Sequence, residues 1–480
     1  MVSTQNEDYT INKNKPSKKT TYRILTVLLI GGLMATLNET ALNIAFPHLM
    51  TQFHISAGTV QWLTTIYIYI SAIVFLVSAY LIERFSTRKL FATAMGFLIV
   101  GTIVACCASN FPVLLFSRVI QAIGTGILIP LIFNTILILV PPERRGVAMG
   151  LMSLVMMFAP TLGPVMMGFI VEYMDWHWFF VLVLVLFIAI AIAGMTFLRN
   201  ITEPGRPDLD FLSVILTAIG FGGIIMGLSG MGDNGLSLDV IVPFIVGVIS
   251  LLVFIRRQLT MEKPMLDLHT FKFSAFRIGI VIVATNVMLT LAMVLILPLY
   301  LQNVLGLSSS VASIVILPGV ILNGVLGIVA GRIYDEHGPR VVISSGVAIS
   351  CIAMVFFSSV SVSTLVAVVI LLQSCFSIGT GLSMTPAQTN SLGTLPRKYY
   401  ASGSAILTAL QQMGGAIGSA LFVSFMTFGQ NNYLQNIVNP TAAQHVQALA
   451  SGADFAFLIA AVILGVVFVL SLFLKRETPT

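Results

Sequence analysis

The stretch QAIGTGILIP, residues 121–130, has a counterpart in FSIGTGLSMTP, residues 376–386. The two Gly-x-Gly pairs lie 255 residues apart. Two further matches keep this offset, namely RGVAMGLM at 145–152 with YASGSAIL at 400–407, and Ala159 and Gly163 with Gly414 and Gly418. A fourth match, AYLIERFSTRK at 79–89 with GRIYDEHGPR at 331–340, has an offset of 252. Four matches in the same order along the chain indicate an internal duplication.

The composition is that of an integral membrane protein. The 480 residues are 57% hydrophobic and only 9% charged, whereas soluble domains carry about 25% charged residues. The apolar runs are continuous and about 20 residues long, which predicts membrane-spanning helices. Fourteen spans are expected, at 22–46, 58–82, 89–109, 112–140, 147–171, 177–198, 210–230, 239–255, 276–304, 308–331, 340–359, 362–392, 401–429 and 454–474. The predicted fold class is therefore all-α.

The basic residues predict the orientation of these spans. With the N-terminus inside, 23 of the 24 lysines and arginines fall in inner segments and none falls in an outer loop. Arg118, inside the fourth span, is the exception. Lysine and arginine are enriched in cytoplasmic loops, so both termini are expected to be cytoplasmic. The net charge of +6 is then a signal of topology and does not predict a nucleic-acid partner.

The duplication and the spans divide the chain into five segments. We expect a disordered cytoplasmic tail (1–21), an N-terminal six-helix bundle (22–198), two inserted helices with a cytoplasmic loop (199–275), a C-terminal six-helix bundle (276–474) and a second cytoplasmic tail (475–480). Parallel repeats of six helices are the arrangement of the two halves of major facilitator transporters, in which substrate binds near the bilayer midplane between the halves.

Four motifs resemble signatures of the major facilitator superfamily. AYLIERFSTRK resembles its loop signature, with Glu83 in the place of an aspartate, and RVIQAIGTG at 118–126 resembles its fourth-helix signature with a buried arginine. GLMSLVMMFAPTLGPVMMG at 150–168 resembles the fifth-helix signature of antiporters. LNETALNIAFP at 37–47 resembles the first-helix signature of fourteen-helix drug:proton antiporters, and within them lincomycin-resistance-type multidrug efflux proteins.

This resemblance implies a function. It implies a proton-coupled antiporter, working as a monomer, that exports drugs or other amphipathic small molecules across the bacterial cytoplasmic membrane by alternating access. The sequence has no Gly-x4-Gly-Lys-Ser/Thr phosphate loop, so we expect no cofactor and a proton gradient as the energy source. Export of a dedicated endogenous metabolite or lipid, and uptake by symport, remain the alternatives. No nucleophile–base pair or metal cluster predicts an enzyme.

Two charged residues are candidates for proton coupling within the first and fourth spans. At about 1.5 Å per helical residue, Glu39 lies roughly 24 Å from the inner face, and Arg118 roughly 20 Å in a core about 30 Å thick. A charge at this depth costs roughly 2.5–3.5 kcal/mol, so the alternatives are a coupling role and an ion pair that only locks two helices. Relatives carry the acid one position earlier, where Asn38 stands. Either Glu39 or Asn38 therefore faces the cavity.

The remaining candidates are grouped by position. Asp454, at the outer start of the last expected span, is read either as a helix N-cap or as a proton relay. The candidates for the substrate cavity are Asn38, Asn43, Gln121, Asn134, Asn286, Gln302 and Gln411. Those for an inner gate are Glu83, Arg84, Arg88, Arg332, Asp335 and Arg340, with charge-based anchoring as the alternative. A kink and close packing of the fifth span are expected at Gly150, Ala159, Gly163, Pro164 and Gly168.

Overall fold

The computed structural model describes residues 17–474, apart from 202–204, 206–209, 235–236, 263, 436 and 438–439. The described residues form helices and no strand. Their α-helices are α1 (Lys18–Ala41), α2 (Phe46–Phe53), α3 (Ala57–Arg84), α4 (Thr87–Cys106), α5 (Phe111–Leu139), α6 (Arg145–Tyr173), α7 (His177–Phe197), α8 (Phe211–Asn234), α9 (Leu238–Thr260), α10 (Ser274–Asn303), α11 (Ser309–His337), α12 (Pro339–Phe357), α13 (Val366–Gly393), α14 (Tyr400–Leu434) and α15 (Ala442–Ser471). Short 3-10 helices are η1 (Leu42–Ala45), η2 (Pro142–Arg144), η3 (Leu268–Lys272) and η4 (Arg397–Tyr399).

Thirteen stretches of helix in the described residues are long and apolar enough to cross a membrane. The first joins α1, η1 and α2, and α8 adds a shorter apolar helix, Phe211–Gly227. The chain is thus a multi-pass membrane protein. α1 begins at Lys18, inside the segment expected as a tail, and residues 1–16 and 475–480 of the two tails lie outside the described residues.

The last helix begins earlier than the sequence predicts. α15 starts at Ala442, and its N-cap is Thr441, which forms a capping box with Gln444. The N-cap interpretation of Asp454 is therefore wrong, because this residue lies well inside α15. Residues 442–453 contain no proline, and the capping box at Thr441 starts the helix before them, so the helix extends beyond the apolar run.

The packing repeats the internal duplication. α6 packs on α1 and α7 on α4, and in the same way α14 packs on α10 and α15 on α12. The matched glycines mark the same interface in both halves, since a Cβ atom at Gly163 would meet the carbonyl oxygen of Leu37 on α1, and one at Gly418 would meet that of Met288 on α10. The two halves also meet through equivalent pairs, α6 with α11 and α14 with α3.

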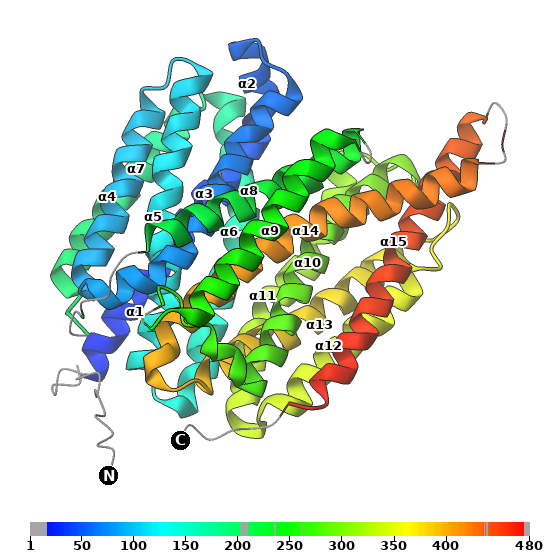
Figure 1. Cartoon of the computed structure of the whole chain (residues 1–480). Coiled ribbons are helices and arrows are strands. Elements are labelled where there is room, and N and C mark those ends of the chain that lie inside the picture. The colour runs from blue at the N-terminus through cyan, green and yellow to red at the C-terminus, as the bar shows by residue number, and fades with distance from the viewer. Residues whose placement is uncertain are drawn as a thin grey trace.

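The inserted helices α8 and α9 form a hairpin at the boundary between the halves (Figure 1). The hairpin is closely packed, because a Cβ at Gly223 would lie 2.8 Å from the Cα of Gly247. α8 contacts α3 of the first half and α14 of the second. Tyr69 on α3 donates a hydrogen bond of 2.9 Å to the carbonyl of Ala218. The insertion therefore touches both halves.

An ion pair closes the end of this hairpin. Arg257 donates to both carboxylate oxygens of Asp210, over 2.6 and 3.1 Å. Asp210 also accepts from the Ser213 hydroxyl. The hydrogen bond from Arg257 holds the pKa of the Asp210 carboxyl below its usual range. The ionised form of Asp210 is thus the one that the folded protein stabilises.

We predict that Asp210→Asn lowers the melting temperature of the purified protein near pH 7. A carboxyl with a lowered folded pKa stabilises above its unfolded pKa of about 3.9. The difference between variant and parent should therefore shrink as the pH falls through the folded pKa. Thermal unfolding in detergent at several pH values measures this, with the exposed acid in Asp239→Asn as the control. An equal, pH-independent loss in both variants would contradict the prediction.

Candidate transport site

The site begins with a change of helix type at the end of α1. The α-helix ends at Ala41 and continues as the 3-10 helix η1. The backbone N–H of Leu42 bonds to the carbonyl of Thr40 and not to that of Asn38, so the carbonyl of Asn38 lacks its usual intrahelical donor. A buried carbonyl needs another donor, and an arginine of α5 supplies it.

Arg118 is fully buried and binds these carbonyls. Its guanidinium donates to the carbonyl oxygens of Asn38 (3.0 Å), Glu39 (2.7 Å) and Leu63 (3.3 Å). It also donates to Gln121 (2.9 Å) and lies 4.3 Å from the ring centre of Tyr67. Arg118 thereby joins α5 to α1 and α3. Within the described residues no carboxylate lies within ion-pair distance of it, so the contact to Glu39 runs through the backbone and not through an ion pair.

The structure shows which of the two side chains, Glu39 or Asn38, faces the boundary between the halves. Glu39 is half-buried, and its carboxylate lies beside the side chain of Gln412 on α14, in the other half of the molecule. Gln412 also donates to the hydroxyl of Ser71 on α3, over 3.4 Å. Asn38 is fully buried, and its amide has no hydrogen-bond partner among the described residues. Glu39 therefore faces the boundary between the halves, and Asn38 faces the interior of the first half.

We predict that Arg118→Met destabilises the protein by at least about 3 kcal/mol. Each buried carbonyl left without a donor costs about 1–3 kcal/mol, and Arg118 serves three of them. Thermal or denaturant unfolding in detergent measures the loss. Arg277→Met, which removes an exposed arginine, is the control and should change stability by less than about 0.5 kcal/mol. Similar losses in the two variants would contradict this account of Arg118.

The other predicted cavity residues do not form one group. Gln121 donates to Thr102 (3.1 Å) and holds α5 to α4, and Asn286 donates to Ser383 (3.0 Å) and holds α10 to α13. Asn43 is exposed and accepts from Thr64 (2.7 Å). The remaining three are Asn134, buried in α5, Gln302, half-buried near the end of α10, and Gln411, buried on α14 with its amide nitrogen unpartnered among the described residues.

The sequence analysis missed two residues beside Arg118 and Glu39. Tyr67 is fully buried beneath Arg118, and its hydroxyl lies 2.5 Å from that of Thr125. Gln412, from the other half, lies beside the carboxylate of Glu39. A glutamine in an apolar span can be recognised in the sequence as a candidate site residue, but one tyrosine among many aromatic residues cannot.

Asp454 does not join this site. It lies on α15, which packs against α10, α12 and α14. Its Oδ1 atom is buried and has no hydrogen-bond partner among the described residues. A proton-relay role for Asp454 would therefore act in the second half, apart from Glu39 and Arg118.

The two halves are locked together at the inner end, defined as the end where α1 begins and α6 begins. Asp335 of α11 accepts hydrogen bonds from the backbone N–H groups of Gly146 (2.9 Å) and Val147 (3.2 Å), the first turn of α6. A carboxylate at this place is favoured by the free N–H groups and the helix dipole. Gly146 packs directly on Gly331 of α11. The two halves are therefore in direct contact at the inner end.

Arg145 is a second lock that the sequence analysis did not assign to the gate. It is buried and donates to the carbonyls of Leu137 (2.8 Å) and Val140 (3.3 Å) in its own half, and to that of Gly393 (3.4 Å) in the other half. Its guanidinium lies 5.5 Å from the ring centre of Tyr400. Arg145 and Tyr400 are matching residues of the duplication, so the two copies meet here.

Among the predicted gate residues, Asp335 makes the contact between the halves. Arg88 instead donates to the carbonyl of Met195 (2.5 Å) within the first half, and the backbone carbonyl of Glu83 accepts from Gly205 (2.7 Å). Arg84 and Arg340 are exposed at helix ends. Arg332 lines a hollow that is described below.

The small residues of α6 face two different neighbours. At its start, a Cβ at Gly150 would lie 2.8 Å from the carbonyl oxygen of Gly327 on α11. Further along, a Cβ at Gly163 would lie 2.5 Å from the carbonyl oxygen of Leu37 on α1. Ala159 is buried, and a Cβ at Gly168 would make only an ordinary contact with Ile44. α6 runs unbroken past these residues, and the side chain of Pro164 lies outside the described residues.

We predict that Gly163→Ala destabilises the protein by about 1–3 kcal/mol, because the added methyl overpacks the α1–α6 contact. The same change at Gly96, whose Cβ would meet nothing within 4 Å, is the matched control. Gly96→Ala should be neutral or stabilising, by up to about 1 kcal/mol, because alanine favours a helix interior. Thermal unfolding in detergent compares the two, and equal effects would contradict the packing argument.

Comparison with known proteins identifies the family. A model of the Major Facilitator Superfamily matches residues 28–419. The chain belongs to the Major Facilitator Superfamily. The homologues and the fold are those of transporters and not of enzymes.

The relatives of this major facilitator protein include drug-resistance proteins. Lincomycin resistance protein LmrB of Bacillus subtilis (strain 168) is 42% identical over 457 residues, which cover 94% of this chain and 95% of that protein. LmrB of Listeria innocua serovar 6a is 41% identical over 454 residues, covering 94% and 96%. The chain is therefore a member of this superfamily that is closely related to lincomycin resistance proteins.

Solved structures share the fold at low sequence identity. The proton:xylose symporter XylE has a TM-score of 0.62 at 15% identity, over 93% of this chain and 95% of that one. The human organic anion transporter MFSD10 has a TM-score of 0.61 at 14% identity, over 92% and 99%. At these identities the likeness shows the fold alone.

Proposed function

We propose that this protein is a proton-coupled antiporter that exports lincomycin-like drugs and other amphipathic small molecules. The observation that carries the proposal is the position of Glu39, a half-buried carboxylate deep in α1 that faces Gln412 of the other half. The relationship to lincomycin resistance proteins supports the class of substrate. The proposal includes fourteen membrane crossings, cytoplasmic termini, a monomeric transporter and no cofactor.

The contacts of Arg118 leave Glu39 available for proton exchange. Arg118 uses its donors on three backbone carbonyls and on Gln121, so it does not form an ion pair with the carboxylate. Its positive charge nevertheless lies close by and favours the ionised carboxylate, which burial opposes. In the proposed cycle, ionised Glu39 binds a polar or cationic group of the drug from inside, and a proton from outside displaces that group.

The inner locks supply the alternating access in this proposal. Closure at the inner end by Asp335 and Arg145 corresponds to the state in which Glu39 communicates with the outside. Opening inward requires breaking at least two hydrogen bonds to Asp335, one from Arg145 to Gly393 and one from Ser153 to Gln388. Hydrogen bonds to charged groups contribute about 1.5–3 kcal/mol each, which is within the range that substrate and proton binding can supply.

The test is Glu39→Gln, which keeps the shape of the side chain and removes its charge. We expect the variant to insert and fold, but to lose lincomycin uptake into inverted proteoliposomes driven by an imposed pH gradient. In a pump-deficient bacterium the parent should confer lincomycin resistance that a protonophore abolishes, and Glu39→Gln should confer none. The matched control is Glu172→Gln, which changes an exposed acid at the end of α6 and should behave as the parent.

The outcomes separate the alternatives. Full transport driven by a pH gradient in Glu39→Gln would contradict the coupling role. Resistance from the parent that survives a protonophore would contradict proton-driven export. Absence of resistance to any compound of a broad drug panel, with normal folding, would instead favour a dedicated endogenous substrate or uptake.

A further inference from the structure

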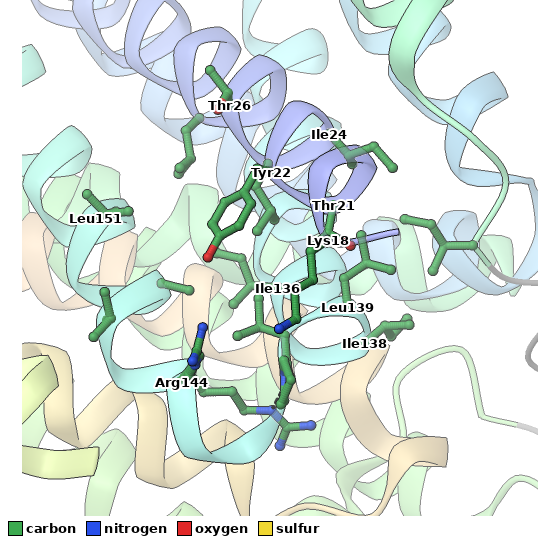
Figure 2. Close-up of a pocket in the computed structure, with 18 of the residues that line it drawn as sticks. Lys18, Thr21, Tyr22, Ile24, Thr26, Ile136, Ile138, Leu139, Arg144 and Leu151 are labelled. Carbon is green, nitrogen blue, oxygen red and sulfur yellow. Dashed lines mark hydrogen bonds between the residues drawn. The ribbon is translucent and has the colours of Figure 1, made fainter. Parts of the chain in front are cut away.

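A hollow of about 1460 Å³ opens at the inner end of the first half (Figure 2). Its walls come from the start of α1, the end of α5, η2, the start of α6, the segment after α7 and the end of α11. It lies at the helix ends, and neither Glu39 nor Arg118 lines it, whereas the inner locks Asp335 and Arg145 do.

The hollow carries a strong excess of positive charge. Seven basic residues line it, against three acids. The side chains of Arg88 and Arg145 donate hydrogen bonds to backbone carbonyls. The carboxylate of Asp335 accepts one from the backbone N–H of Gly146 at the start of α6. By contrast, Lys18, Arg144 and Arg199 are exposed, and no hydrogen bond or ion pair joins their side chains to the described residues.

The other walls of the hollow are apolar. Ile24, Leu25 and Leu29 of α1 face it, together with Ile136 and Leu139 of α5. Tyr22 and Leu151 stand at its rim and are 62% and 42% exposed. Figure 2 shows the side chains of Lys18, Tyr22 and Arg144 extending into the same space from α1 and η2. Cations, an aromatic ring and an apolar wall therefore lie together at the expected membrane surface.

We propose that this hollow binds an anionic phospholipid of the inner leaflet. Lys18, Arg144 and Arg199 hold the phosphate of the headgroup, and one acyl chain lies along α1 and α6 beside Tyr22 and Leu151. Basic pockets between helices at the cytoplasmic surface suit anionic headgroups, and tyrosine is favoured at the level of the headgroups. A water-soluble phosphate would use the cations but would leave the apolar wall exposed to water.

The bound lipid would also lie beside the contacts that join the two halves at the inner end. Arg332 and Arg397 of the second half line the same hollow as Arg144 of the first. An anionic headgroup in this place neutralises cations from both halves at once. It therefore stabilises the closed inner end. This inference goes beyond the proposed transport function and does not depend on which compound is exported.

The experiment measures binding of phosphatidylglycerol to delipidated, purified protein by native mass spectrometry. The variant Lys18→Gln/Arg144→Gln/Arg199→Gln removes three of the five lining cations that no hydrogen bond or ion pair joins to the described residues. Each basic residue near an anionic membrane surface contributes about a fivefold factor in affinity, so the triple variant should bind about 100-fold more weakly. The control Arg256→Gln/Lys272→Gln/Arg277→Gln removes three exposed cations that do not line the hollow. It should bind within about threefold of the parent.

A second variant tests the lipid against a free phosphate. Leu151→Ser makes the apolar wall polar without changing the charge, and should weaken phosphatidylglycerol but leave binding of inorganic phosphate unchanged. Phosphatidylcholine should bind the parent and both triple variants equally weakly. Equal losses in the two triple variants would overturn the proposed site. Displacement of phosphatidylglycerol by millimolar inorganic phosphate, with no effect of Leu151→Ser, would identify a soluble-phosphate site and overturn the lipid.

Discussion

The structure of the first half depends on one buried arginine. The change from α-helix to 3-10 helix at Ala41 leaves the end of α1 in need of a donor, and the guanidinium of Arg118 donates to the carbonyls of Asn38 and Glu39 there. It also donates to the carbonyl of Leu63 on α3, and a buried charge needs such hydrogen bonds to offset the loss of water. Arg118 therefore ties α1, α3 and α5 together.

The duplication provides two similar bundles, but the lock between them is not symmetric. Asp335 caps the start of α6 across the boundary, whereas its counterpart in the first half, Glu83, is a glutamate held through its backbone to Gly205. Arg145 meets Tyr400, its own counterpart, instead of another arginine. The charged contacts between the halves at the inner end are therefore few, and they come from unlike residues of the two copies.

Much of the fold could be predicted from patterns that lie within short segments of the sequence. Apolar run length predicted thirteen of the fourteen expected spans at full length, and the duplication predicted two similar halves, in which Gly163 and Gly418 make equivalent contacts. The site was harder to predict. Arg145 looked like one of many inner arginines, Tyr67 like one of many aromatic residues, and Gln412 was separated from Glu39 by most of the chain. Their roles depend on neighbours from distant segments, which no local pattern contains.

The sequence by itself determined that the chain crosses the membrane many times, is built from two parallel halves and carries one acid and one base deep in its spans. The reason is that apolar run length, internal offset and the cost of buried charge are properties of short segments. Only the tertiary structure decided that Arg118 binds backbone carbonyls, that Glu39 and not Asn38 faces the other half, and that Asp335 and Arg145 close the inner end. These are decided by the packing and register of helices that lie far apart in the sequence, by 79 residues for Glu39 and Arg118 and by 248 for Arg145 and Gly393.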